Sequence, residues 1–385
     1  MPSGFQTYDR FSWARSLSTT MPKLIREVED AAKKNYAILA LLEAKGRIST
    51  GHGGEGIQWP VKYRRHSASA ATGENSRSFN PTSLFKVAGL DWRGYEVTDS
   101  IKRREMEKNQ GEAAIIKVLD GFAERLKSSL IEELGPQFYV DGEDPDNERF
   151  WHGFKTFART NGQTVNISGA GARSVNAADK VAVPSGTYAS LSCVLGNYGG
   201  AQEAGVPYPE GIQDPEYDFW SPLIVQRDSS AFDNASSNAS NGEKLEKALR
   251  YGLTHAQRNS TIDSQVTNVF MDRNLFIDLK DFEGGRQTIE VKMAPGSMIE
   301  LGFLNVMRFD GIEVSFENAV PNGYAFGLNM NAMELMALTS ELFSDEGGPQ
   351  YDLATQSLNA VVSTLSNLKY KSPRNFVVWK PNSEI

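Results

Sequence analysis

Residues 46–98 constrain the fold most, because they show strand-like alternation between two segments with helical periodicity. In the first part, Ile57, Trp59, Val61 and Tyr63 alternate with polar residues or proline, which is the two-residue period of a half-buried strand. Proline at position 60 cannot donate a ladder hydrogen bond, so this strand is predicted to lie at a sheet edge.

A return strand is predicted over 84–97, where Leu90 and Trp92 alternate with Asp91 and Arg93. The small polar residues 67–76 between the two strands favour a tip, so the whole stretch is expected to be a long hairpin.

The predicted hairpin carries more apolar surface than an isolated hairpin can leave in water. Two strands alone are marginally stable, and a soluble monomer rarely exposes a large apolar patch. The hairpin therefore either folds back onto its own chain or lies on another copy, and the sequence leaves both open. Its six large aromatic residues are Trp59, Tyr63, Phe79, Phe85, Trp92 and Tyr95.

One helix is predicted on each side of this hairpin. The first runs over 22–45, with Pro22 at its first position and Gly46 as its C-terminal stop. The second runs over 112–134, where leucine and other apolar residues recur every three or four positions, and Gly135-Pro136 is expected to end it.

The remainder mixes helices and strands, which predicts an α+β fold. Residues 138–222 are rich in loops with a short helix over 188–195, and the polar segment 228–242 is predicted to be an exposed loop. The other elements expected are a helix over 243–257, a strand over 266–271, a short helix over 275–279, and strands over 288–293, 298–303, 311–316, 323–328, 361–362 and 376–379.

Composition argues against several classes of protein. The chain has 385 residues and a net charge of −8, the opposite sign from a specialised nucleic-acid binder. Its apolar runs are shorter than the roughly 18 residues of a membrane span. The single cysteine, Cys193, excludes an internal disulfide framework and a cysteine-based zinc site. The first residues lack a secretory pattern, so a cytosolic origin is expected.

Motifs for catalysis or cofactor binding are absent or misplaced. Residues 51–56 match G-x-G-x-x-G, but a helix precedes them and a strand follows, the reverse of a dinucleotide site. The acidic run 141–146 lacks the spacing of a calcium loop, so a solvated turn is favoured. We therefore predict no catalytic, cofactor-binding or metal-binding residues. Lys62, Arg64 and Arg65 around Tyr63 carry too little charge to bind nucleic acid, and favour an acidic surface on a neighbouring subunit.

Short motifs occur in a characteristic order along the chain. They are NQGEAAI at 109–115, FWSP at 219–222, FDGIEV at 309–314, VPNGYAFGLN at 320–329 and KSPRN at 371–375. Together with the order of arm, helix, hairpin, long helix and α+β body, they resemble the Hong Kong 97-type major capsid proteins of tailed bacteriophages.

The resemblance implies a chain in five parts. These are an N-terminal arm and helix (1–45), an extended hairpin loop (46–98), a spine helix and the start of a peripheral domain (99–147), an axial domain (148–285), and peripheral-domain strands that return to the axial domain (286–385). In that family the hairpin reaches over an adjacent subunit. The intersubunit contacts implied here are Trp59, Lys62, Tyr63, Arg64, Phe85 and Trp92.

The function implied is structural, without a cofactor. Copies of the chain would form pentamers and hexamers of an icosahedral head that encloses double-stranded DNA without sequence-specific binding. The N-terminus lacks a long helical extension, so any scaffolding protein would be a separate chain, and portal and decoration proteins are further expected partners. The resemblance places the protein in the virion capsid, assembled in the host bacterial cytoplasm and not in a membrane.

Two alternatives remain at this point. The first is the shell of an encapsulating nanocompartment with the same fold, and the second is a cytosolic enzyme with an unrecognised site. Deleting residues 50–95 is expected to leave a folded core that cannot build shells.

Overall fold

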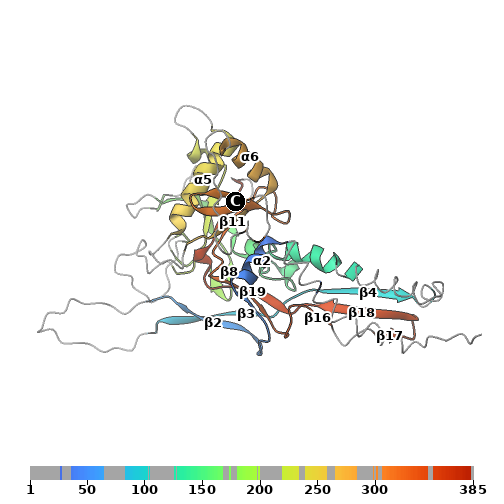
Figure 1. The fold of residues 1–385 in the computed structure, drawn as a ribbon. Helices are drawn as coiled ribbons and strands as arrows, with labels where there is room; N and C mark the ends of the chain where they lie inside the picture. The colour runs from blue at the N-terminus through green and yellow to red at the C-terminus, as the bar shows by residue number, and fades with distance from the viewer. Residues whose placement is uncertain are drawn as a thin grey trace, which may run out of the picture.

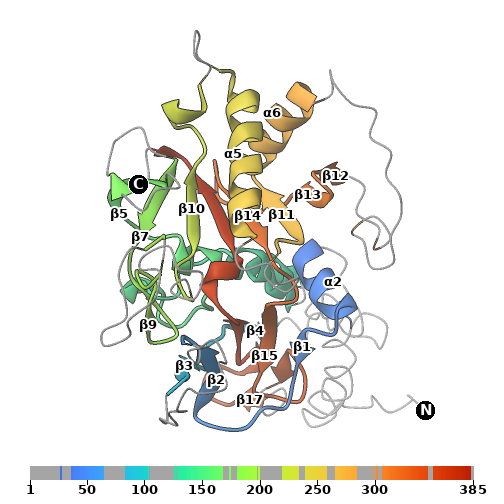
Figure 2. The ribbon, with the colours of Figure 1, turned by 90° about the vertical axis from the view of Figure 1, so that its left-hand side faces the viewer.

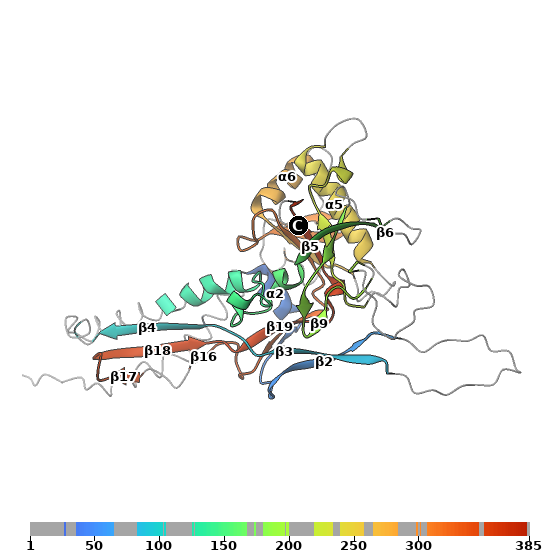
Figure 3. The same cartoon turned by 180° about the vertical axis from the view of Figure 1, so that it is seen from behind.

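The computed structural model describes residues 36–64, 83–102, 128–167, 180–196, 219–233, 239–257, 265–283, 306–345 and 350–382, with a few shorter pieces between them. Two thin extensions project in opposite directions from the base of a body that carries helices α5 and α6 (Figure 1). One extension is the hairpin of β2 and β3, and the other contains β4, β17 and β18; the view from behind shows the same arrangement (Figure 3).

The body is built on a nine-stranded sheet in the order β12-β13-β11-β14-β20-β10-β7-β5-β6. Its central strands are buried along their whole length, in keeping with their largely apolar sequences. The strands are β5 (Thr160–Ile167), β6 (Arg173–Ser174), β7 (Val181–Pro184), β10 (Leu223–Gln226), β11 (Asn268–Met271), β12 (Val306–Phe309), β13 (Ile312–Phe316), β14 (Ala325–Leu328) and β20 (Val377–Lys380).

Helices α5 (Asn241–Ala256) and α6 (Arg273–Glu283) pack on one face of this sheet (Figure 2). The alternation along β20 separates two cores, because Trp379 faces the helices whereas Val378 faces the opposite core. The Trp379 ring lies where a Cβ on Gly252 of α5 would be, and its Nε1 donates to the Ala248 carbonyl at 2.8 Å. A glycine is therefore required for this close approach of helix and strand.

The second core is aromatic and joins the body to both extensions. Its edge-to-face contacts include Phe157 with Tyr370, whose centroids are 5.1 Å apart, and Tyr370 with Phe376 at 5.0 Å. Its aromatic members with no more than 2% exposure are Phe138, Trp151, Phe154, Phe157, Tyr188, Trp220, Phe270, Phe326, Phe343, Tyr370 and Phe376.

Helix α2 (Ala37–Ala44) ends as the sequence predicts. Gly46 adopts a φ of 62°, its N–H donates to the Glu43 carbonyl, and the Arg47 N–H donates to the Leu42 carbonyl. This pair of bonds is a Schellman motif, which requires a left-handed residue after the helix. The part of the prediction that covers residues 22–35 lies outside the described residues, apart from one helical position.

The second predicted helix is described at its C-terminal end, where it continues to residue 137 instead of ending before Gly135. Pro136 removes one helical hydrogen bond, the one to the carbonyl four residues earlier, and the helix ends one residue after it. Gly135 has a packing role instead: a Cβ there would collide with the ring of Tyr36, whose hydroxyl donates to the Ile131 carbonyl at 2.7 Å.

The extension opposite the hairpin is a four-stranded sheet. Strand β4 (Glu96–Lys102) pairs antiparallel with β18 (Ser357–Ser363) over seven residue pairs, and β16 (Ser344–Asp345) and β17 (Gln350–Asp352) flank β18. A separate three-stranded sheet, β1-β15-β19, lies under the body. Its strands are β1 (Ile48–Ser49), β15 (Met333–Ala337) and β19 (Ser366–Tyr370).

Several sequence predictions need correction. The helix over 188–195 is instead a small hairpin of β8 (Thr187–Tyr188) and β9 (Leu191–Ser192), with Ala189 and Ser190 both at positive φ. The return strand over 84–97 is two strands, because its last residues belong to β4. Within 228–242, Ser229 and Phe232 are buried rather than exposed.

Strands from both sides of residue 285 share the large sheet, since β12, β13 and β14 join the same sheet as β7, β10 and β11. The division of the chain into five parts stays a prediction. The strands predicted over 288–293 and 298–303 lie outside the described residues apart from isolated positions.

Candidate functional site

The hairpin has an inner face that belongs to the core of its own chain. Strands β2 (Gly56–Lys62) and β3 (Phe85–Asp91) pair only with each other among the described residues, which confirms the edge-strand prediction for β2. The Trp59 indole donates to the Lys371 carbonyl at 3.2 Å, and its ring centroid lies 6.3 Å from that of Tyr188. The buried inner-face residues are Ile57, Trp59, Val61, Ala88 and Leu90.

Because of this inner face, the expected result of deleting residues 50–95 changes. The deletion removes six buried side chains from the aromatic core, the five of the inner face and Tyr95, and also the main-chain bond from Gly89 to the Ala189 carbonyl. A folded core is no longer expected to survive. Of the two possibilities left open by the sequence, folding back onto the chain therefore applies to this face.

The outer hairpin face, defined by Gln58, Pro60 and Lys62 on β2 and by Phe85 and Val87 on β3, points away from the chain. Pro60 is paired with Val87, and Lys62 with Phe85, so these side chains lie on one surface. Phe85 is 55% exposed and Val87 is 63% exposed. Adjacent large apolar side chains with this exposure are typical of a protein contact surface.

The six residues predicted to make intersubunit contacts divide between the two faces. Trp59 is buried, and Tyr63 is half-buried with its ring centroid 6.1 Å from that of Phe219. Trp92 is half-buried and donates from its indole to the Gly54 carbonyl at 3.0 Å. The remaining three are Lys62 and Phe85, which are exposed, and Arg64, which is half-buried.

Sequence reasoning missed Val87 as a candidate. The sequence does contain the pattern that identifies Val87. The alternation of Leu90 with Asp91, continued toward lower residue numbers, places the Val87 side chain on the opposite face of the strand from Leu90. The turn after β17 presents a second apolar residue that was missed, Leu353, which is 71% exposed. Asp352 fixes this turn by accepting from the Ala354 N–H at 2.9 Å and from the Thr355 hydroxyl at 2.7 Å.

The end of the second helix meets the body at a buried carboxyl group. The Tyr139 hydroxyl donates to Glu317 Oε2 at 2.7 Å, whereas Oε1 has no hydrogen-bond partner among the described residues. Burial raises the pKa of Glu317 to about 7, although the hydrogen bond from Tyr139 opposes this change. The Glu317 carboxyl group is therefore protonated at acidic pH and becomes a buried negative charge at alkaline pH.

Replacing Glu317 with glutamine is expected to stabilise the subunit at pH 8. Because the folded state holds the proton more tightly than the unfolded chain, the free energy of unfolding falls as pH rises from the ordinary value of 4.5 to about 7. That interval corresponds to about 3 kcal/mol, which the amide avoids because its oxygen can still accept from Tyr139. Urea unfolding of Glu317→Gln and of an exposed control, Glu341→Gln, between pH 4.5 and 8 measures the gain. The prediction would be contradicted if the free energies of unfolding of wild type and Glu317→Gln changed with pH in parallel.

The cysteine, histidine and acidic side chains of this region, which are the types used in covalent catalysis and metal binding, are held in contacts that serve the fold. Burial raises the pKa of the Cys193 thiol strongly, so it stays protonated and is a poor nucleophile. Interaction with His152, whose Nε2 lies 3.6 Å from Glu143 Oε1, lowers the pKa of Glu143, and Asn367 contacts the other ring nitrogen of His152 at 2.9 Å. Within the described ranges, no three histidine, cysteine or acidic residues are grouped to hold a metal ion.

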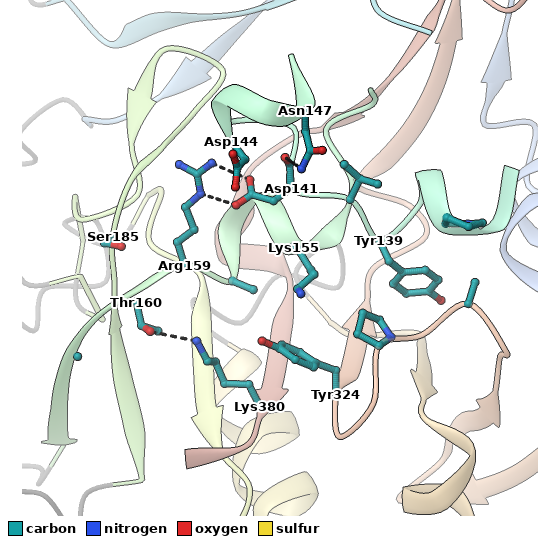
Figure 4. A pocket seen from close by; sticks show the side chains of 16 residues that line it. Tyr139, Asp141, Asp144, Asn147, Lys155, Arg159, Thr160, Ser185, Tyr324 and Lys380 are labelled. Carbon is teal, nitrogen blue, oxygen red and sulfur yellow. Dashed lines mark hydrogen bonds and ion pairs between the residues drawn. The ribbon is translucent and has the colours of Figure 1, made fainter. Parts of the chain in front are cut away.

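The two remaining sequence motifs also have defined places. Residues 51–56 connect β1 to β2, with a strand and not a helix after them, as the sequence order predicts. In the acidic run, Asp141 pairs with Arg159 (Figure 4), and Asp144 caps a 3-10 helix (Pro145–Asn147) by accepting from the Asp146 N–H. In the part of the chain that the structure describes, no helix is long and apolar enough to cross a membrane.

Comparison with known proteins identifies the fold. No family model matches the sequence, and no curated protein does. The capsid asymmetric unit of cyanophage A-1(L) matches with a TM-score of 0.55 and 13% identity, over 90% of this chain and 92% of that chain. The capsid of a native GTA particle matches with a TM-score of 0.50 and 11% identity, over 89% and 90%. The α+β fold of the Hong Kong 97 type, predicted from the sequence, is therefore confirmed.

Proposed function

We propose that this chain is the major capsid protein of a tailed bacteriophage, and that its role is structural and not catalytic. The matched structures support this function, because they are capsids that align with nearly the whole chain. Copies would form pentamers and hexamers that close into an icosahedral head around double-stranded DNA. The head would assemble in the host bacterial cytoplasm and remain as the virion capsid.

The observation that carries this proposal is the difference between the two hairpin faces. The inner face is satisfied within the chain, whereas the outer face leaves Phe85 and Val87 in solvent. Covering these side chains with a neighbouring copy removes apolar area from water, and Lys62 on the same face can approach an acidic group of that neighbour. In a closed shell each such contact is repeated by symmetry, so a modest interface is sufficient.

The side chains proposed to contact the neighbour are accordingly Lys62, Arg64 and Phe85 of the original six, together with Val87. Trp59, Tyr63 and Trp92 would support the contact by fixing the hairpin against its own chain. A separate scaffolding protein, a portal protein and a decoration protein are proposed as further partners. The enclosed DNA would be held without sequence-specific binding, in keeping with the net charge of −8.

Electron microscopy of the purified protein tests the proposal. Closed, roughly spherical particles of uniform size are expected under at least one assembly condition, because every subunit presents the same contact faces. Particles recovered from phage-producing cells should protect DNA from nuclease, which separates a viral head from a compartment filled with cargo protein. A chain that remains a dispersed monomer under all conditions would contradict the proposal.

A further inference from the structure

Strand β3 has one edge against β2 and a second edge that faces away from it. Tyr63 donates its main-chain N–H to the Leu84 carbonyl at 3.1 Å, so this pair occupies a hydrogen-bonded position of the antiparallel ladder. Such positions recur at every second pair along the two strands. Phe85, Val87 and Gly89 lie at the alternate positions, and their main-chain N–H and carbonyl groups therefore point away from β2.

The chain covers this second edge at one end only. The Gly89 N–H donates to the Ala189 carbonyl at 3.1 Å, which confirms the outward direction of the group. The main-chain groups of Phe85 and Val87 have no such partner among the described residues, in which β2 and β3 form a sheet of their own. The two N–H and two carbonyl groups of Phe85 and Val87 form the open edge of β3.

The opposite edge of the hairpin is blocked by proline. Pro60 is paired with Val87 at a non-hydrogen-bonded position, so its ring takes the place of an outward N–H on β2. Proline on an edge strand prevents a further strand from pairing there, and thereby limits association between chains. The open edge of β3 has no proline, and both of its side chains are more than half exposed. One edge of the hairpin is therefore protected, and the other can accept a strand.

We propose that the open edge of β3 receives an extended segment of a second copy of this chain, which adds a third strand to the hairpin. The inference rests on the proposed function and specifies how the contact is made. The incoming main chain would bond to the open edge, while its side chains would cover Phe85 and Val87 on the outer hairpin face. Lys62, which is paired with Phe85, adds a positive charge that suits a partner with a net charge of −8.

Hydrogen exchange of the wild-type full-length chain tests this pairing without a substitution. The Lys86 and Ala88 amides point toward β2, whereas those of Phe85 and Val87 point into solvent in the dissociated subunit. In particles assembled from this chain alone, the latter two should exchange about a hundredfold more slowly or less, because an amide in a strand ladder exchanges only when the pairing opens. Equal exchange of both amides in subunits and particles would overturn the inference.

Proline substitution separates edge pairing from packing of the outer hairpin face. Val87→Pro removes the outward N–H and keeps an apolar side chain, at a position whose partner on β2 is already Pro60. Particle yield should fall by about tenfold or more, because the ring also obstructs the incoming strand. Val87→Ala keeps the N–H and should lower the yield less. Gln58→Pro, an exposed position on the edge that Pro60 already blocks, should assemble like wild type.

Circular dichroism and thermal unfolding should be alike for wild type and these three variants. If Val87→Pro does not fold, the hydrogen-exchange measurement decides alone. The inference is overturned, and the proposed function stands, if wild type forms particles and Val87→Pro lowers their yield no more than Val87→Ala does. If wild type forms no particles, the proposed function is wrong, and the inference that rests on it is wrong as well.

Discussion

Replacing Phe85 and Val87 together with aspartate is expected to abolish the formation of closed particles and to leave the subunit folded. Both side chains are more than half exposed on the outer hairpin face, so the folded subunit tolerates polar groups there. In the proposed contact, however, the two carboxylates would have to leave water beside apolar surface without a partner. Such a penalty is several kcal/mol for each contact, roughly 2–5, and it recurs at every copy in the shell.

The measurement is particle yield by sedimentation and electron microscopy under conditions in which wild type assembles. A matched control places two aspartates at the same spacing on another strand, Thr98→Asp with Ser100→Asp on the exposed side of β4. Circular dichroism and thermal unfolding should be alike for wild type and both variants. Normal particles from the Phe85/Val87 variant would show that the outer face is not a subunit contact.

Local sequence patterns predicted the elements whose structure depends on their own residues. The alternation over 57–63 gave the correct faces of β2, and Gly46 gave the correct end of α2, since period and turn chemistry are local properties. The strand predicted over 311–316 likewise corresponds to β13, which follows a turn where Asp310 and Gly311 adopt positive φ. The order of these elements along the chain then predicted the fold class.

Elements that depend on distant partners were predicted less well. The apolar residues around Tyr188 were taken for a helix, but the Tyr188 hydroxyl donates to the Leu368 carbonyl and accepts from the Tyr370 N–H. These bonds, almost two hundred residues away in the chain, hold a tight hairpin instead. In the same way, β4 leaves the hairpin because β18 offers it a full ladder.

The candidate contact residues show the same difference between what local sequence predicts and what distant parts of the chain decide. Aromatic character selected Trp59 and Phe85 equally, yet one lies in the core and the other in solvent. A strand pattern says which residues share a face, but not which face another part of the chain covers.

Replacing Trp59 with alanine is expected to destabilise the subunit severely, by about 3–5 kcal/mol, because a large buried aromatic side chain is lost from a packed core. Trp59 is only 6% exposed, and its removal also leaves the Lys371 carbonyl without its indole donor. The variant should therefore unfold at much lower urea than wild type. The effect is best measured by introducing Trp59→Ala into the Phe85/Val87 double-aspartate variant. That variant is expected to stay unassembled, so contacts in the shell cannot add to the stability of the subunit.

In that comparison Phe85→Ala in the otherwise wild-type chain is the matched control from the opposite face. It should change the free energy of unfolding of the dissociated subunit by less than about 1 kcal/mol, because the ring is largely in solvent before folding and after it. It should nevertheless lower particle yield, since the ring is proposed to be covered only in the shell. Equal destabilisation by the two alanine variants would contradict the assignment of the faces. Loss of stability from one face and loss of assembly from the other would show that one hairpin serves both the fold and the shell.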